Sequence, residues 1–145
     1  MNSKKIERTR KIVRFERQVL QAITQQLRAI ASKVAKVESE ITSLIFELQE
    51  NQVRHCETID SISHRQMTVS QNDFLNKKIE SLRLQQDRLE QEMQQVLDGL
   101  TEQKIKVDVI EKLLHKQEAA YQKHLSERQN LELLDIVNAK FLETS

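Results

Sequence analysis

Apolar residues recur every seven positions through the first half of the chain. The row runs from Ile6 to Ile62 and has one polar member, His55. Its apolar members are Ile6, Val13, Leu20, Leu27, Val34, Ile41, Leu48 and Ile62. A second row, made of Ile23, Ile30, Val37 and Leu44, completes the two seam positions that repeat in each heptad of a coiled coil. The pattern predicts one helix from about residue 4 to about residue 65.

The apolar period lapses near the middle of the chain and then resumes. The resumed row contains Leu75, Ile79, Leu82, Leu89, Met93, Val96, Leu100, Val107, Ile110, Leu114 and Tyr121. Ser70 and Asp73 are spaced as a helix N-cap and an acidic first turn. They predict a turn at about residues 66–70 and a second helix at about residues 71–142. A short polar connection favours antiparallel neighbours, so we expect an all-α fold, a long antiparallel two-helix coiled-coil hairpin that occupies residues 1–145 as one unit.

The position of the turn sets which residues face each other across the seam. A turn at residues 66–70 pairs Ile41 with Val96 and places Asn51 opposite Gln86. The two polar side chains would then hydrogen-bond to each other and penalise slipped registers. A parallel homodimer is the alternative, but it stacks Asn51 on itself and gives the lapse in the pattern no role.

The same register leaves the last residues of the chain, 132–145, without a facing helix. This segment contains Leu133, Leu134, Ile136, Val137, Phe141 and Leu142. Such a cluster exposes apolar surface on an isolated hairpin and indicates a partner that receives this end as a helix in a groove. Folding back of the tail and self-association are the alternatives.

Apolar residues also gather where the hairpin tip is expected. Met67, Val69, Phe74 and Leu75 lie at or beside the predicted turn, where two helices bury side chains only in part. An aromatic side chain at such an end either closes the seam or belongs to a second contact surface.

The composition excludes most enzyme classes. The chain has one glycine, no proline and no tryptophan, and aromatic residues make up 3% of it while charged residues make up 31%. Phosphate-binding loops need glycine at positive φ, and Gly99 lies inside an apolar-periodic run. We therefore expect no sheet-based enzyme domain and no nucleotide-binding loop.

Basic residues are concentrated at the N-terminus. Residues 1–36 hold ten basic side chains and two acidic ones, Glu7 and Glu16. On a helix, two rows form, one of Lys4, Arg8 and Lys11 and the other of Arg10, Arg14 and Arg17. The rows are either a solvated end or a surface for an acidic protein, nucleic acid or an anionic membrane.

Neither metal nor catalytic chemistry is indicated by the remaining residues. The histidines, at positions 55, 64, 115 and 124, form no pair three or four residues apart. The lone cysteine, Cys56, indicates a reducing compartment, and there is no apolar stretch of signal-peptide or membrane-spanning length. We expect a cytoplasmic protein that is not an enzyme and needs no cofactor or metal.

Two stretches of the second half resemble a known family. They are Val109–Tyr121, which contains the run Glu-Lys-Leu-Leu, and the tail Glu127–Phe141. Together with the basic N-terminal helix and the central turn, they resemble the FliJ/YscO family over nearly the whole chain. The dense basic rows depart from the family pattern and leave open which end docks where.

The resemblance implies a cytoplasmic component of flagellar or injectisome type III export, and the residues favour neither system. It implies a protein that resembles the central stalk of rotary ATPases, binds the hexameric export ATPase and promotes its assembly or activity. The intramolecular hairpin itself predicts a monomer. The resemblance also implies contacts with the export gate protein and export chaperones, and a place at the cytoplasmic face of the inner membrane only through these partners. The residues carried over to the ATPase-facing end are Lys4, Arg8, Lys11, Arg14, Leu134, Val137 and Phe141. Those carried over to the hairpin tip, where the gate would bind, are Met67, Phe74 and Leu75.

Two functions from other classes remain as alternatives. One is a passive scaffold or tether that changes no activity of its partner. The other is a nucleic-acid binder with a basic region, but such a binder needs the fork of a parallel dimer, so no nucleic-acid partner is expected for a hairpin.

Overall fold

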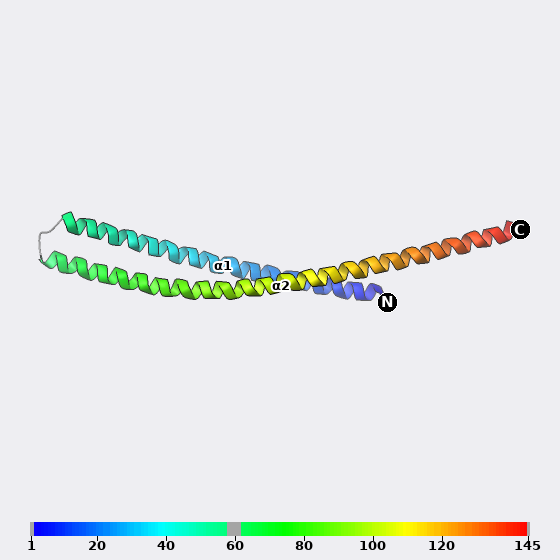
Figure 1. Cartoon of the computed structure of the whole chain (residues 1–145), viewed down its shortest axis with the longest axis horizontal. Coiled ribbons are helices and arrows are strands. Elements are labelled where there is room, and N and C mark those ends of the chain that lie inside the picture. The colour runs from blue at the N-terminus through cyan, green and yellow to red at the C-terminus, as the bar shows by residue number, and fades with distance from the viewer. Residues whose placement is uncertain (1, 58–61, 145) are drawn as a thin grey trace. The chain divides into compact units, whose positions relative to one another are not determined.

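The computed structural model describes residues 2–57 and 62–144, and both segments are helical. α1 spans Asn2–Glu57 and α2 spans Ile62–Thr144. The two helices pack against each other and run in opposite directions (Figure 1). The predicted fold class, an all-α antiparallel two-helix coiled-coil hairpin, is confirmed.

The predicted position of the turn is wrong. Residues 66–70 lie inside α2, which begins at Ile62, and α1 ends at Glu57. The segment has no glycine or proline to end a helix, and the Thr68 hydroxyl donates a 2.9 Å hydrogen bond to the His64 carbonyl one turn earlier. Polar residues at seam positions therefore interrupt the apolar pattern here without interrupting the helix.

Contacts group the chain into two compact units. We call residues 22–100 the hairpin unit, and residues 1–21 together with 101–145 the terminal unit. Each unit contains a stretch of both helices.

The core of the hairpin unit is a narrow apolar seam. Val37 and Ile41 of α1 form a buried cluster with Ile79 and Leu82 of α2. The side chains of Leu44, Ile45, Leu48 and Leu89 pack against this cluster and are partly buried. The heptad positions thus identify the buried face correctly, except that Ile62, at the start of α2, is exposed.

The predicted pairing across this seam is wrong by about two heptads. Ile41 packs in the cluster of Ile79 and Leu82, not against Val96, and Gln86 donates a 3.2 Å hydrogen bond to Glu38 rather than facing Asn51. Sliding one helix by whole heptads keeps apolar residues opposite apolar residues, so the pattern alone does not choose among such registers. Because the predicted pairing follows from the predicted turn, the error in the position of the turn also shifts the pairing.

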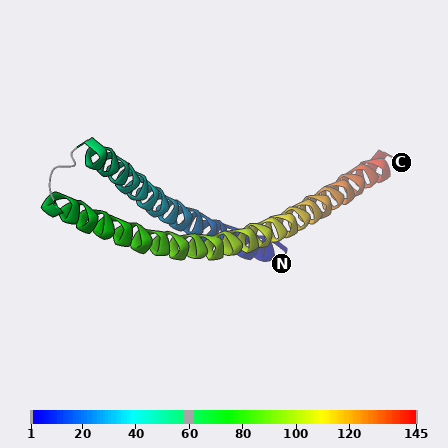
Figure 2. The same ribbon diagram turned by 60° about the vertical axis from the view of Figure 1, so that its left-hand side comes forward.

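The terminal unit has a seam that mixes apolar and polar side chains. Its buried residues are Ile6, Thr9, Val13 and Glu16 of α1 and Gln103 and Val107 of α2. Past the start of α1, α2 continues as a single helix (Figures 1 and 2). Every described side chain of residues 126–143 is exposed, and we call this segment the overhang. It begins earlier than the predicted residue 132 because of the shift in register.

Candidate partner-binding surfaces

A buried polar cluster joins the two helices of the terminal unit. Gln103 Nε2 donates hydrogen bonds to the Glu16 backbone carbonyl, at 3.0 Å, and to Glu16 Oε2, at 2.5 Å. Lys106 Nζ forms an ion pair with Glu16 Oε1 at 3.2 Å. The hydrogen bond from Gln103 and then the one from Lys106 lower the pKa of Glu16 below its ordinary value, against the opposing effect of desolvation. Glu16 is therefore held as a carboxylate inside the seam.

Two of the predicted basic residues link α1 to α2. Arg10 pairs with Glu118 at 3.3 Å, and Arg17 pairs with Glu111 at 2.6 Å. The arginines are one heptad apart and so are the glutamates, which makes the two ion pairs equivalent steps of one ladder. This part of the second basic row has a structural role within the unit.

The other predicted cations form an open surface on α1. Lys4, Arg8, Lys11 and Arg14 are exposed, and their side chains form no hydrogen bond or ion pair among the described residues. Lys4, Arg8, Lys11 and Phe15 follow a spacing of four, three and four, which places them on one side of the helix, beside Ile12. Phe15 is 61% exposed and Ile12 is 49% exposed.

We call Lys4, Arg8, Lys11, Ile12 and Phe15 the basic face. Its two apolar members, Ile12 and Phe15, are not among the residues predicted from the sequence. The signal that would have found them is the presence of large apolar residues outside the heptad seam positions, between cations.

The overhang carries an exposed apolar stripe. Leu134, Val137 and Phe141, spaced three and four residues apart, are 57%, 59% and 73% exposed. Each of these residues lies one position before a residue that would continue the α2 seam. One position corresponds to about 100° of rotation around the helix axis. We call these three residues the overhang stripe, and it does not prolong the surface that packs on α1.

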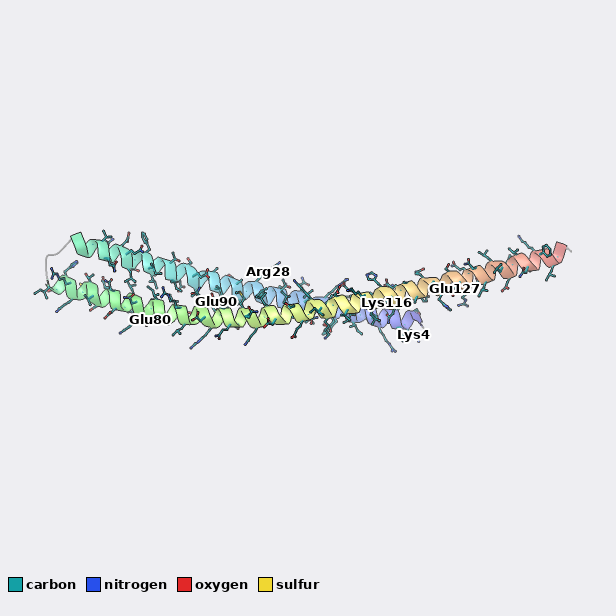
Figure 3. All side chains as sticks on the ribbon, in the orientation of Figure 1. Lys4, Arg28, Glu80, Glu90, Lys116 and Glu127 are labelled. Carbon is teal, nitrogen blue, oxygen red and sulfur yellow. The ribbon has the colours of Figure 1, made fainter. Side chains whose placement is uncertain are left out.

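The structure does not bring the two halves of the expected ATPase-facing site into contact. The start of α1 lies beside Glu118, Tyr121 and Gln122, with which Ile6 and Arg10 line a hollow of about 280 Å³. Phe141 is about 30 Å farther along α2, at 1.5 Å per residue. Figure 3 shows the same order, with Lys4 on α1 and Glu127 on α2 beyond the start of α1. The basic face and the overhang stripe are therefore two surfaces of one unit.

The residues expected at the tip come together in the hairpin unit. Met67, Phe74 and Leu75 line a groove of about 660 Å³ between the helices, opposite Leu44 and Asn51 of α1. Met67 and Phe74 are exposed, whereas Leu75 is buried in the seam. The groove thus combines a seam residue with two apolar side chains that face solvent.

The described residues contain no group of histidine, cysteine and carboxylate side chains placed to hold a metal ion. Within residues 2–57 and 62–144, neither helix is long and apolar enough to cross a bilayer. The side chains of His55 and Cys56 lie outside the described part of the chain. Comparison with protein-family models, curated proteins and solved structures found no match for this chain.

Proposed function

We propose that this chain is a non-enzymatic component of a type III protein export apparatus that binds the hexameric export ATPase and promotes its assembly or activity. The proposal rests on the resemblance of Val109–Tyr121 and Glu127–Phe141 to the FliJ/YscO family. The structural observation that carries it is the terminal unit, where a two-helix stem with a basic face is followed by a single amphipathic helix.

This arrangement suits insertion of one end into a ring. The overhang stripe offers apolar anchors at the spacing by which helices dock into grooves, and the basic face meets acidic side chains on the ring. To promote hydrolysis, the inserted end has to bind some conformations of the ring subunits more tightly than others. A protein that binds all conformations equally would act only as a tether.

The groove of the hairpin unit is our candidate for the export gate protein or export chaperones. Met67 and Phe74 supply exposed apolar surface there, and Lys78 and Glu47 at its margin supply charge. In this proposal the protein works in the cytoplasm and reaches the inner membrane only through its partners.

The test is the ATP hydrolysis rate of the cognate export ATPase, measured with increasing amounts of this protein. We expect saturable stimulation. The substitutions Leu134→Asp and Val137→Asp together remove it, whereas Phe46→Asp, which changes an exposed apolar residue of the hairpin unit, leaves it intact. No stimulation by correctly folded protein would overturn the proposal and favour the passive tether.

A further inference from the structure

The terminal unit carries more apolar surface on its outside than one hairpin needs. Ile12 and Phe15 on α1 are exposed, and so is a row on α2 formed by Ile105, Val109 and Leu113. Its seam, in contrast, contains buried Glu16, Gln103 and Thr9. Helices that are apolar on more than the face toward their partner are typical of bundles with further helices.

We propose that two copies of this chain associate through their terminal units, with the overhang of each copy lying along the basic face of the other. Each copy then covers the basic face and the overhang stripe of its partner. The inference does not depend on the proposed function. If both hold, the second copy and the export ATPase compete for the same surfaces.

Charge favours this pairing. Residues 126–143 contain four acidic side chains, Glu127, Glu132, Asp135 and Glu143, and two basic ones, Arg128 and Lys140. Residues 2–17 contain seven basic side chains and two acidic ones. Arg10 and Arg17 are paired with glutamates of α2, and Glu16 is bound by Gln103 and Lys106, which leaves five basic side chains and one acidic one. An acidic apolar helix and a basic apolar face therefore exist in the same unit, and oppositely charged surfaces attract at short range.

Length and position also match. The overhang is about 27 Å long, and the basic face from Lys4 to Phe15 covers about 17 Å. The overhang begins where α1 begins, so two copies related by a twofold axis, side by side and antiparallel, bring each overhang beside the partner's α1. Both contacts form at once, and such an isologous interface closes without producing a filament.

Within one copy the two surfaces do not cover each other. Leu134, Val137 and Phe141 lie past the start of α1 on a continuous helix, so they do not reach Ile12 or Phe15 of the same chain. A second copy of the chain carries both complementary surfaces, an overhang for the basic face and a basic face for the overhang. An anionic membrane would complement the basic face and leave the acidic overhang open.

The first test is sedimentation equilibrium of the full chain over a wide concentration range. We expect a monomer–dimer equilibrium that weakens with added salt. Leu134→Asp with Val137→Asp raises the dimer dissociation constant about tenfold or more, because it places charge in the apolar contact. The matched control Phe46→Asp changes a similarly exposed residue of the hairpin unit and leaves the dissociation constant unchanged. Circular dichroism shows that each variant remains helical.

The second test identifies the contact. In a Cys56→Ser background, copies with Phe15→Cys are mixed with copies with Val137→Cys under mild oxidation. We expect a disulfide between the two kinds of copy and none when Phe46→Cys replaces Phe15→Cys. A monomer at every concentration, a dimer unaffected by the overhang substitutions, or cross-links only between two Val137→Cys copies would each overturn the proposal. None of these readouts involves ATP hydrolysis, so failure here is distinguishable from failure of the proposed function.

Discussion

Gln103 of α2 donates hydrogen bonds to both the side chain and the backbone carbonyl of Glu16 on α1. A shift of α2 by one heptad in either direction would replace Gln103 with Val96 or Ile110. The Glu16 carboxylate would then be buried against an aliphatic side chain with no donor, which is costly. This pair therefore selects one register from a set that the apolar residues alone leave equivalent.

Replacing Gln103 tests this role. We expect Gln103→Leu to lower the midpoint of urea unfolding, because the Glu16 carboxylate loses the hydrogen bond from Gln103 and keeps only the ion pair with Lys106 while staying in the seam. The control is Gln94→Leu, since Gln94 is exposed and bonds only within α2, to Asp98. Equal midpoints for the two variants would show that the bond to Glu16 does not stabilise the fold.

The lowered pKa of Glu16 predicts that the stability of the fold depends on pH in the acid range. Its pKa in the folded protein lies below the ordinary value of 4.5, because Gln103 and then Lys106 stabilise the carboxylate. The stabilisation is thus fully present above pH 4.5 and is lost as the pH falls through the lowered pKa of the folded state. Thermal unfolding followed across this range should show a shallower loss of stability in Glu16→Gln. An identical acid profile in the two proteins would contradict this role for Glu16.

The apolar cluster of the hairpin unit should dominate the stability of that unit. Ile41 is buried beside Ile79 and Leu82, so Ile41→Ala removes packed methyl groups and leaves a partial cavity. We expect a loss of about 2–4 kcal/mol in the free energy of urea unfolding. Phe46→Ala, on the exposed side of the same helix, should change it by less than about 0.5 kcal/mol. A comparable loss of unfolding free energy in both variants would mean that burial in the seam is not the source of the stability.

The ion pair between Arg17 and Glu111 should couple the helices weakly. Both side chains are partly exposed, so we expect a coupling free energy of about 0.2–1 kcal/mol from a double-mutant cycle with Arg17→Gln and Glu111→Gln. The coupling should fall when the salt concentration rises. A value of zero at low salt would show that this pair contributes nothing to the stem.

A proline substitution at Val69 tests whether α2 begins before residues 66–70. Val69 lies in the exposed helical segment that was predicted as the turn. Val69→Pro should cost about 3 kcal/mol and reduce helix content, because proline removes a helical hydrogen bond and clashes with the preceding turn. Val69→Ala should cost little. Tolerance of proline by circular dichroism and urea unfolding would return the turn to residues 66–70.

The sequence predicts the buried face well and the longitudinal arrangement poorly, for one physical reason. Seam residues such as Val13, Val37 and Val107 are identified by a period of seven, and burial depends only on that period. The pairing depends on where α1 ends and α2 begins, and no glycine or proline stands next to Glu57 or Ile62 to mark these boundaries. The buried pair of Glu16 and Gln103 carries the missing information, but it becomes visible only once the two residues are known to face each other.

The candidate surfaces could likewise be predicted only in part, because the period of seven identifies only the buried face. Leu134, Val137 and Phe141 were expected to lack a facing helix even with the wrong register, because α2 is longer than α1 in both arrangements. Ile12 and Phe15 were missed because they lie outside the heptad rows. Their exposure follows from the seam, which leaves that side of α1 open.

Binding of a partner to the overhang is coupled to folding of the overhang helix. A helix of this length with exposed side chains is marginal in water, although its continuity with the rest of α2 removes the cost of nucleation. Amide exchange in the isolated chain should therefore accelerate steadily from residue 126 toward residue 143, as the helix opens from its free end. A partner that docks on the overhang stripe has to suppress this opening, which lowers its affinity per unit of buried area and makes binding sensitive to helix propensity at positions it never touches. Substitutions such as Asn138→Ala would then tighten binding without adding a contact.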